Sequence, residues 1–93
     1  MSDGSFIKDP GARLDYSWDW SEWLGEVSDT ISSATVTVPA GLTAVGAPVV
    51  GDTVVTQRVS GGDADAAYRL VCQITTVGGL IDERSIYLTI AER

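Results

Sequence analysis

Histidine is absent from this chain, and cysteine occurs once, at position 72. Without histidine the chain lacks the commonest general base and metal ligand of proteins, so no Ser/His/Asp triad, Cys/His dyad or Cys/His zinc site can form. A single cysteine also excludes an internal disulfide, and we interpret Cys72 as a small buried hydrophobic residue. We therefore expect a protein that is not an enzyme and that binds no cofactor.

Basic residues are scarce as well. Six lysines and arginines stand against thirteen acidic residues, which gives a formal net charge of −7 at pH 7. That balance argues against a nucleic-acid partner, which requires a basic face. No apolar run approaches the roughly 20 residues of a membrane span, and the first residues lack the features of a secretory signal. We expect no nucleic-acid or membrane partner. We also expect a chain that is made in a cytoplasm and either stays there or leaves it only as part of something larger.

No segment has the length and period of a long helix; short alternating stretches recur instead. They are separated by Gly, Pro and Ser turn signals and occupy 13–18, 29–38, 41–45, 53–59, 67–77 and 81–91. The last two flank Gly78-Gly79, a two-residue hairpin signal. This pattern predicts an all-β fold, an Ig-like β-sandwich of about seven antiparallel strands.

The length of 93 residues fits one domain. We place it at residues 13–93, after a polar N-terminal arm at residues 1–12. Pro10 and Gly11 punctuate the end of the arm, so we expect an ordered strand only from Arg13. Residues 46–52, rich in Gly, Pro and Val, are predicted to form a loop between sheets.

The aromatic residues are concentrated in one stretch whose period changes partway along. Tyr16, Trp18 and Trp20 alternate with polar residues, as in a half-buried strand, and we expect them in the core. Trp20, Trp23 and Leu24 then follow the i, i+3, i+4 spacing of a short helical turn near residues 19–24. Trp23 and Leu24 lie beyond the strand face, so we predict that they contact a partner.

The acidic residues around this turn have two readings. Asp19 with Glu22 three residues later forms a capping-box pattern, and Gly25 would close the turn, so both carboxylates are predicted to be structural. Calcium is the alternative, because it accepts carboxylate oxygens. The acidic residues that raise this alternative form two groups: Asp15, Asp19, Glu22, Glu26 and Asp29, and separately Asp63 and Asp65.

Tyr68 opens the clearest predicted strand. The segment around it resembles the tyrosine corner of Ig-like and fibronectin-type domains, in which a tyrosine hydroxyl bonds backbone a few residues upstream. We assign Tyr68 that structural role.

Residues 8–24, KDPGARLDYSWDWSEWL, resemble the opening of small tailed-phage virion proteins of the fiber–tail adaptor type. That family begins with K-D-P followed by L-D-Y-x-x-D-W-x-x-W-L. Later elements resemble it in the same order, so the likeness extends over about residues 8–91. The segments concerned are 29–31, 41–43, 59–62, 68–76 and 78–85.

The resemblance implies a non-enzymatic β-sandwich subunit of a phage particle, present in several copies in the tail, neck or fiber-attachment region. It implies other virion proteins as partners, a homo-oligomer in a symmetric ring or collar, no cofactor, and location in the virion after assembly in the bacterial cytoplasm. An open sheet edge and the arm through Asp9 and Pro10 are further candidate contacts, and we expect the arm to become ordered only against a neighbour.

Two alternatives remain at this point. A carbohydrate-binding module would stack sugars on exposed rings, and Trp18, Trp20, Trp23 and Tyr87 are the candidates. A host-encoded Ig-like interaction domain unrelated to phage is the other.

Overall fold

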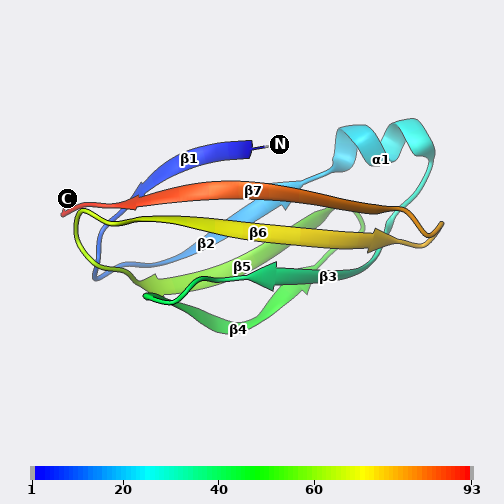
Figure 1. Cartoon of the computed structure of the whole chain (residues 1–93). Helices are drawn as coiled ribbons and strands as arrows, with labels where there is room; N and C mark the ends of the chain where they lie inside the picture. The colour runs from blue at the N-terminus through cyan, green and yellow to red at the C-terminus, as the bar shows by residue number, and fades with distance from the viewer. Residues whose placement is uncertain (1, 93) are drawn as a thin grey trace.

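The computed structural model describes the backbone of residues 2–92 and the side chains of residues 4–92, and within that range seven strands and one helix form a two-layered β-sandwich (Figure 1). The elements are β1 (Ser2–Lys8), β2 (Arg13–Asp19), α1 (Ser21–Val27), β3 (Ile31–Thr37), β4 (Leu42–Val50), β5 (Val54–Gly61), β6 (Ala67–Thr76) and β7 (Ile81–Ile90). One sheet has the order β1-β7-β6-β3, the other β2-β5-β4. The predicted all-β sandwich is confirmed.

The strand order is that of an Ig-like domain with its first strand displaced. The β2-β5-β4 sheet corresponds to the B-E-D strands and β3-β6-β7 to the C-F-G strands of the constant-type fold. β1 joins β7 rather than β2, and the two run parallel. The expectation that all strands would be antiparallel is therefore wrong for this one pair.

β1 also corrects the prediction of an unstructured arm. Residues Ser2–Lys8 pair with β7, so ordered strand does not begin only at Arg13, and the arm needs no neighbour to become ordered. Two contacts hold β1 across the sandwich. The Phe6 ring lies 5.4 Å from that of Tyr16 on β2, and Lys8 Nζ donates to the carbonyl of Gly61 on β5 at 2.6 Å. Lys8 is fully buried, and this desolvation lowers its pKa although Asp9 opposes the shift.

The core lies between the inward faces of the two sheets. Strand alternation supplies it: β6 contributes Leu70, Cys72 and Ile74, each fully buried, while Val71 and Gln73 between them are half-buried and exposed, respectively. Trp18 and Trp20 are fully buried and Tyr16 is nearly so. Burying such side chains contributes roughly 1.5–3 kcal/mol each, which makes the aromatic stretch a main source of stability for a domain of this size.

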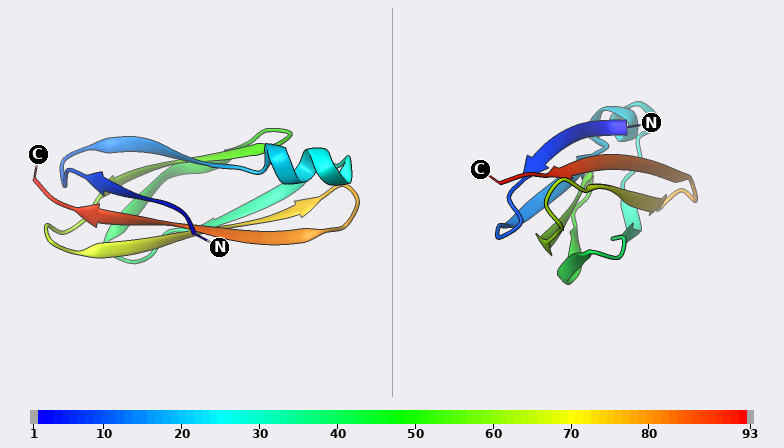
Figure 2. Two further views of the ribbon diagram at one scale, coloured as in Figure 1. Left: turned by 90° about the horizontal axis from the view of Figure 1, so that it is seen from above. Right: turned by 60° about the vertical axis from the view of Figure 1, so that its left-hand side comes forward.

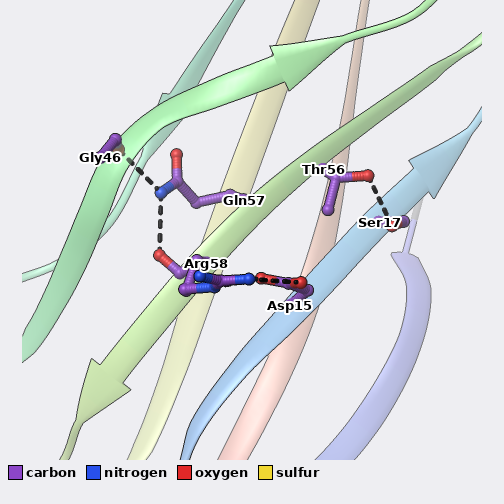
Figure 3. Close-up of polar contacts among 6 residues, drawn as sticks. All are labelled: Asp15, Ser17, Gly46, Thr56, Gln57 and Arg58. Atoms are coloured by element: carbon purple, nitrogen blue, oxygen red, sulfur yellow. Dashed lines mark hydrogen bonds and ion pairs between the residues drawn. The ribbon is translucent and has the colours of Figure 1, made fainter.

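β4 is longer than predicted. We expected residues 46–52 to form a loop, but β4 continues to Val50, with a register shift between Val45 and Val49. Gly46 permits the bulge because its φ is +75°, and the Nε2 group of buried Gln57 donates to the Gly46 carbonyl at 3.2 Å (Figure 3). Pro48 is tolerated because β4 is an edge strand.

Tyr68 lies at the start of β6, as the tyrosine-corner resemblance implies. Its hydroxyl accepts a hydrogen bond from the backbone N–H of Asp63, five residues upstream, at 3.2 Å. The ring also packs against Gly41, where a Cβ would come within 2.7 Å of the hydroxyl oxygen. The contact joins the β5–β6 and β3–β4 turns.

The sandwich is elongated, 42 Å by 23 Å by 17 Å. α1 lies at one end together with the α1–β3 loop and the β4–β5 and β6–β7 turns, and the β1–β2, β3–β4 and β5–β6 turns and the C-terminus lie at the other (Figures 1 and 2). Among the described residues, no helix has the length and apolar character needed to cross a membrane.

Candidate interaction surface at the α1 end

α1 begins differently from the prediction. The helix runs from Ser21 to Val27 with Trp20 at the N-cap, and no side-chain cap hydrogen bond is present there, so the capping box with Glu22 is wrong. Asp19 instead accepts a hydrogen bond from the Ser21 backbone N–H at 2.8 Å. This bond is the main cause that lowers the Asp19 pKa, and a hydrogen bond from the Ser21 side chain is the second. Gly25 does not close the helix, which ends at Val27 and has Ser28, with φ +53°, as its C-cap.

A polar cluster fastens the start of α1 to β7. The buried Trp20 ring donates its Nε1–H to Asp82 Oδ2 at 2.8 Å. The Arg84 guanidinium lies 5.2 Å from the centroid of the Trp20 ring and donates to the Asp19 carbonyl at 2.9 Å. Arg84 also forms an ion pair with Asp82, with 3.5 Å between Arg84 Nε and Asp82 Oδ2. Trp20, Asp82 and Arg84 together join the helix to the opposite sheet.

Asp29 fastens the end of α1 to the β6–β7 turn. Its carboxylate accepts the Gly78 N–H at 3.1 Å and the Thr30 N–H at 2.8 Å. The hydrogen bond from the Thr76 side chain is the main cause that lowers the Asp29 pKa, followed by that from the Thr30 backbone. The Val77 N–H donates to the Thr30 carbonyl at 2.9 Å. The helix, the following loop and the hairpin thus form one connected unit.

Two shallow hollows flank α1. One of about 420 Å³ is lined by Asp19, Ser21, Glu22, Trp23, Glu26 and Arg84. The other, of about 360 Å³, lies between the far side of the helix and Val77. Several large apolar side chains on α1 and on the strand ends and turns at this end are exposed: Val27, Val50, Val77, Leu80 and Ile81. We call this set, with α1 and the hollows, the α1-end surface.

The four predicted partner-contact residues have different positions. Trp23 is half-buried, packs against the core and lines the larger hollow. Leu24 is only 1% exposed, so its assignment as a contact residue is wrong; the i, i+4 spacing that linked it to Trp20 places it in the core. Asp9 and Pro10 lie at the opposite end, where the Asp9 carboxylate accepts the Gly11 N–H at 2.8 Å.

The outer face of the β2-β5-β4 sheet offers a smaller hollow of about 220 Å³. Its charged groups are paired with each other: Arg58 Nε donates to Asp15 Oδ1 at 2.9 Å across strands β2 and β5, which lowers the Asp15 pKa (Figure 3). The neighbouring Ser17 and Thr56 hydroxyls are 2.9 Å apart. These cross-strand pairs stabilise the sheet and leave little polar chemistry for a ligand.

Of the carboxylates that raised the calcium alternative, Asp19, Glu22 and Glu26 line one hollow beside α1, and Asp15 lies on the outer face of the other sheet. Among the side chains that the structure describes, no three His, Cys, Asp or Glu groups are placed to hold a metal ion. Asp15 pairs with Arg58, while Asp19 and Asp29 accept backbone N–H groups.

Comparison with known proteins identifies the family. Residues 8–89 match the family described as podophage GP4 fiber-tail adaptor protein gp77. The chain belongs to this family. The match covers β2 to β7 except Ile90, and of β1 it includes only Lys8. It confirms the tailed-phage adaptor resemblance and with it a structural role as a virion component.

Two further comparisons add the fold alone. No curated protein matches the sequence. Among solved structures, a 2,6-sialyltransferase of Photobacterium sp. JT-ISH-224 resembles the chain with a TM-score of 0.59 and 8% identity. The similarity covers 99% of this chain but 18% of that protein, so it shows only that the same arrangement of strands occurs there.

The rings named for carbohydrate stacking are mostly unavailable. Trp18 and Trp20 are fully buried, and Trp23 is half-buried. Tyr87 is 41% exposed, but it lies on β7 away from the α1 hollows. The structure contains no described set of exposed rings around a polar hollow that favours a sugar ligand.

Sequence reasoning missed several residues of the α1-end surface. Asp82, Arg84 and Asp29 acquire their roles only through contacts with distant segments. Val77 and Ile81 were assigned to a hairpin, and no sequence signal indicated that this hairpin would lie beside α1. Only Gly78-Gly79 in the sequence indicated that Val77 and Ile81 flank a turn, where apolar side chains are exposed.

Proposed function

We propose that this chain is a multi-copy structural subunit that joins fiber and tail components in a podophage particle, where its copies form a symmetric ring or collar. The family match over residues 8–89 is the observation that carries the proposal. The structure supports it through its shape, since a rigid sandwich 42 Å long with distinct surfaces at its two ends suits a connecting element. Many copies on one particle would make weak individual contacts sufficient.

The charged groups at the α1 end also fit a structural role. Asp19, Asp29 and Arg84 are engaged in hydrogen bonds that hold α1 and the neighbouring turns in place. Such bonds pre-organise a contact surface, which reduces the entropy lost when the surface binds a partner.

The test is the composition of purified particles. We expect the chain to be present in several copies per particle by quantitative mass spectrometry, and a deletion mutant to produce tails without fibers in electron micrographs. A particle that lacks the chain contradicts the proposal, and a single copy contradicts its multi-copy part. The mass of the isolated chain in solution shows whether the ring forms alone or only on the particle.

A further inference from the structure

The α1-end surface combines exposed apolar side chains with a rigid base. Val77 and Ile81 are 72% and 65% exposed, although the β6–β7 hairpin that carries them is fastened to the α1–β3 loop through Asp29. α1 is likewise held to β7 by Trp20 and Asp82. Because these elements are fixed to each other, the helix cannot move over the apolar residues to shield them. The exposed patch is therefore a permanent feature of this end.

Charge is distributed unevenly along the sandwich. The α1 end carries seven carboxylates and one guanidinium, Arg84, so six of the seven net negative charges lie there. The rest of the sequence has six acidic and five basic residues, close to balance. The seven carboxylates belong to Asp19, Glu22, Glu26, Asp29, Asp52, Asp82 and Glu83.

This charge decides among the possible occupants of the patch. A second copy bound through the same surface would place two strongly negative ends against each other, and like charges across an interface cost several kcal/mol. Anionic lipid surfaces and nucleic acids would be repelled for the same reason. A protein surface with Lys and Arg residues around an apolar centre is complementary in both respects.

We propose that the α1-end surface docks onto such a basic-rimmed apolar patch of a different virion protein. This proposal rests on the proposed adaptor function. Val77, Leu80 and Ile81 supply the apolar centre of the contact. Glu22 and Glu26 are exposed one turn apart on the side of α1 away from Val77, and they supply the acidic rim on that side.

The experiment complements a phage that lacks the gene with variants of the chain and measures the chain in purified particles by mass spectrometry. Glu22→Lys/Glu26→Lys reverses the charge of the rim. Asp63→Lys/Glu92→Lys is the matched control, because it makes the same change in net charge with exposed residues at the opposite end. We expect the first pair to lower incorporation about tenfold or more and the control to change it about twofold or less.

A second matched pair tests the apolar centre. Val77 and Val49 are 72% and 70% exposed, but Val49 lies on the outer face of β4. We expect Val77→Thr to lower incorporation roughly three- to tenfold and Val49→Thr to leave it unchanged. Thermal melting of each purified variant shows that it folds, and Glu22→Gln/Glu26→Gln replaces the lysine pair if that variant does not.

The outcomes separate the two proposals. If the wild-type chain is absent from particles, the adaptor function is wrong. If it is present and the α1-end variants enter particles as well as their controls do, or if both pairs fail equally, the docking inference is wrong. Sedimentation of the isolated wild-type chain gives an independent check: self-association that strengthens with added salt and is lost in Val77→Thr would assign the patch to a second copy and overturn the inference.

Discussion

Trp18 and Trp20 are both fully buried, and they differ in what their indole N–H groups meet. The Trp20 Nε1–H donates to Asp82, whereas the Trp18 Nε1–H has no hydrogen-bond partner among the described residues. A buried donor without an acceptor is destabilising by about 1–3 kcal/mol. The Asp82 carboxylate removes that penalty for Trp20, so this half-buried residue on β7 helps to hold the start of α1.

Substitution of Asp82 tests this role. Asp82→Ala leaves the Trp20 N–H without its acceptor and removes a neighbour of Arg84, so we expect the free energy of unfolding to fall by about 1–3 kcal/mol. Asp82→Asn keeps an acceptor oxygen and is expected to lose about 1 kcal/mol or less. Urea unfolding followed by tryptophan fluorescence measures both. Glu83→Ala is the control and should stay within about 0.5 kcal/mol of wild type. Equal losses for the alanine and asparagine variants would show that the acceptor is unimportant.

Gly41 is a second position where one residue matters for a distant contact. Its φ is +102°, and a Cβ would come 2.7 Å from the Tyr68 hydroxyl. Gly79 has a similar φ of +91° but open space around it. The two glycines therefore separate the effect of backbone conformation from that of the close approach to Tyr68.

We expect Gly79→Ala to destabilise the fold by about 1–2 kcal/mol, from backbone conformation alone. Gly41→Ala should add about 1–3 kcal/mol, because the methyl group pushes the Tyr68 ring away and strains the corner. Urea denaturation of both variants measures the difference. If the two losses are equal, the Gly41 side of the tyrosine corner accommodates a methyl group and the contact is not tight.

At the scale of elements, the sequence predicts accurately the strands that bury one face in the core, and it misses the strand that depends on pairing with a distant segment. β2, β6 and β7 alternate clearly, since one face of each is buried, and their predicted bounds differ from the observed ones by about one residue. The β1 sequence lacks that alternation, because it is an edge strand that exists through pairing with β7, more than 75 residues away in the chain. No local signal reports such a partner.

Other misses have the same physical origin. Gly46 and Pro48 are typical of a loop, but in β4 they lie at a bulge of an edge strand. The Gly46 carbonyl in this bulge accepts a hydrogen bond from Gln57. Asp19 and Glu22 have the residue types and spacing of a capping box. The N-cap is nevertheless Trp20, one residue after the predicted Asp19, and the Trp20 side chain is buried in the core. The α1-end surface required three segments to converge, and that convergence is a tertiary property.

Lys8 makes the attachment of β1 testable. Its buried ammonium group joins β1, through Nζ, to the carbonyls of Gly61 and Asp9. Lys8→Met keeps the apolar stem and removes the donor, so we expect a loss of about 1–3 kcal/mol of stability. Hydrogen exchange should rise mainly in the β1 amides and little in β6, because an edge strand opens locally before the sheet unfolds. Arg13→Met, at an exposed position with the same change in charge, is the control. Equal exchange in the two variants would mean that Lys8 does not hold the strand.

At the scale of the whole molecule, acidification has two opposing effects. Protonating carboxylates reduces the repulsion within the negative α1 end, which favours folding. It also removes stabilising bonds, because Asp15, Asp19 and Asp29 have pKa values in the folded protein below those of ordinary aspartates. A carboxyl group whose pKa is lower in the folded state stabilises the fold above its unfolded-state pKa, about 3.9, and loses that contribution as the pH falls through its folded-state pKa.

We expect the second effect to dominate, because the three carboxylates hold specific contacts while the repulsion is partly screened by salt. The melting temperature should change little between pH 7 and about pH 5 and fall below about pH 4. Asp29→Asn should lower the melting temperature at pH 7 and make its fall at acid pH less steep. An asparagine amide is not protonated in this range, so the variant has no carboxylate bond to the β6–β7 turn that acid could remove. Asp52→Asn removes a charge from an exposed loop at the same end, without such a bond among the described residues, and should leave the acid limb unchanged. A melting temperature that rises steadily from pH 7 to pH 3 would show that relief of repulsion outweighs the loss of these bonds.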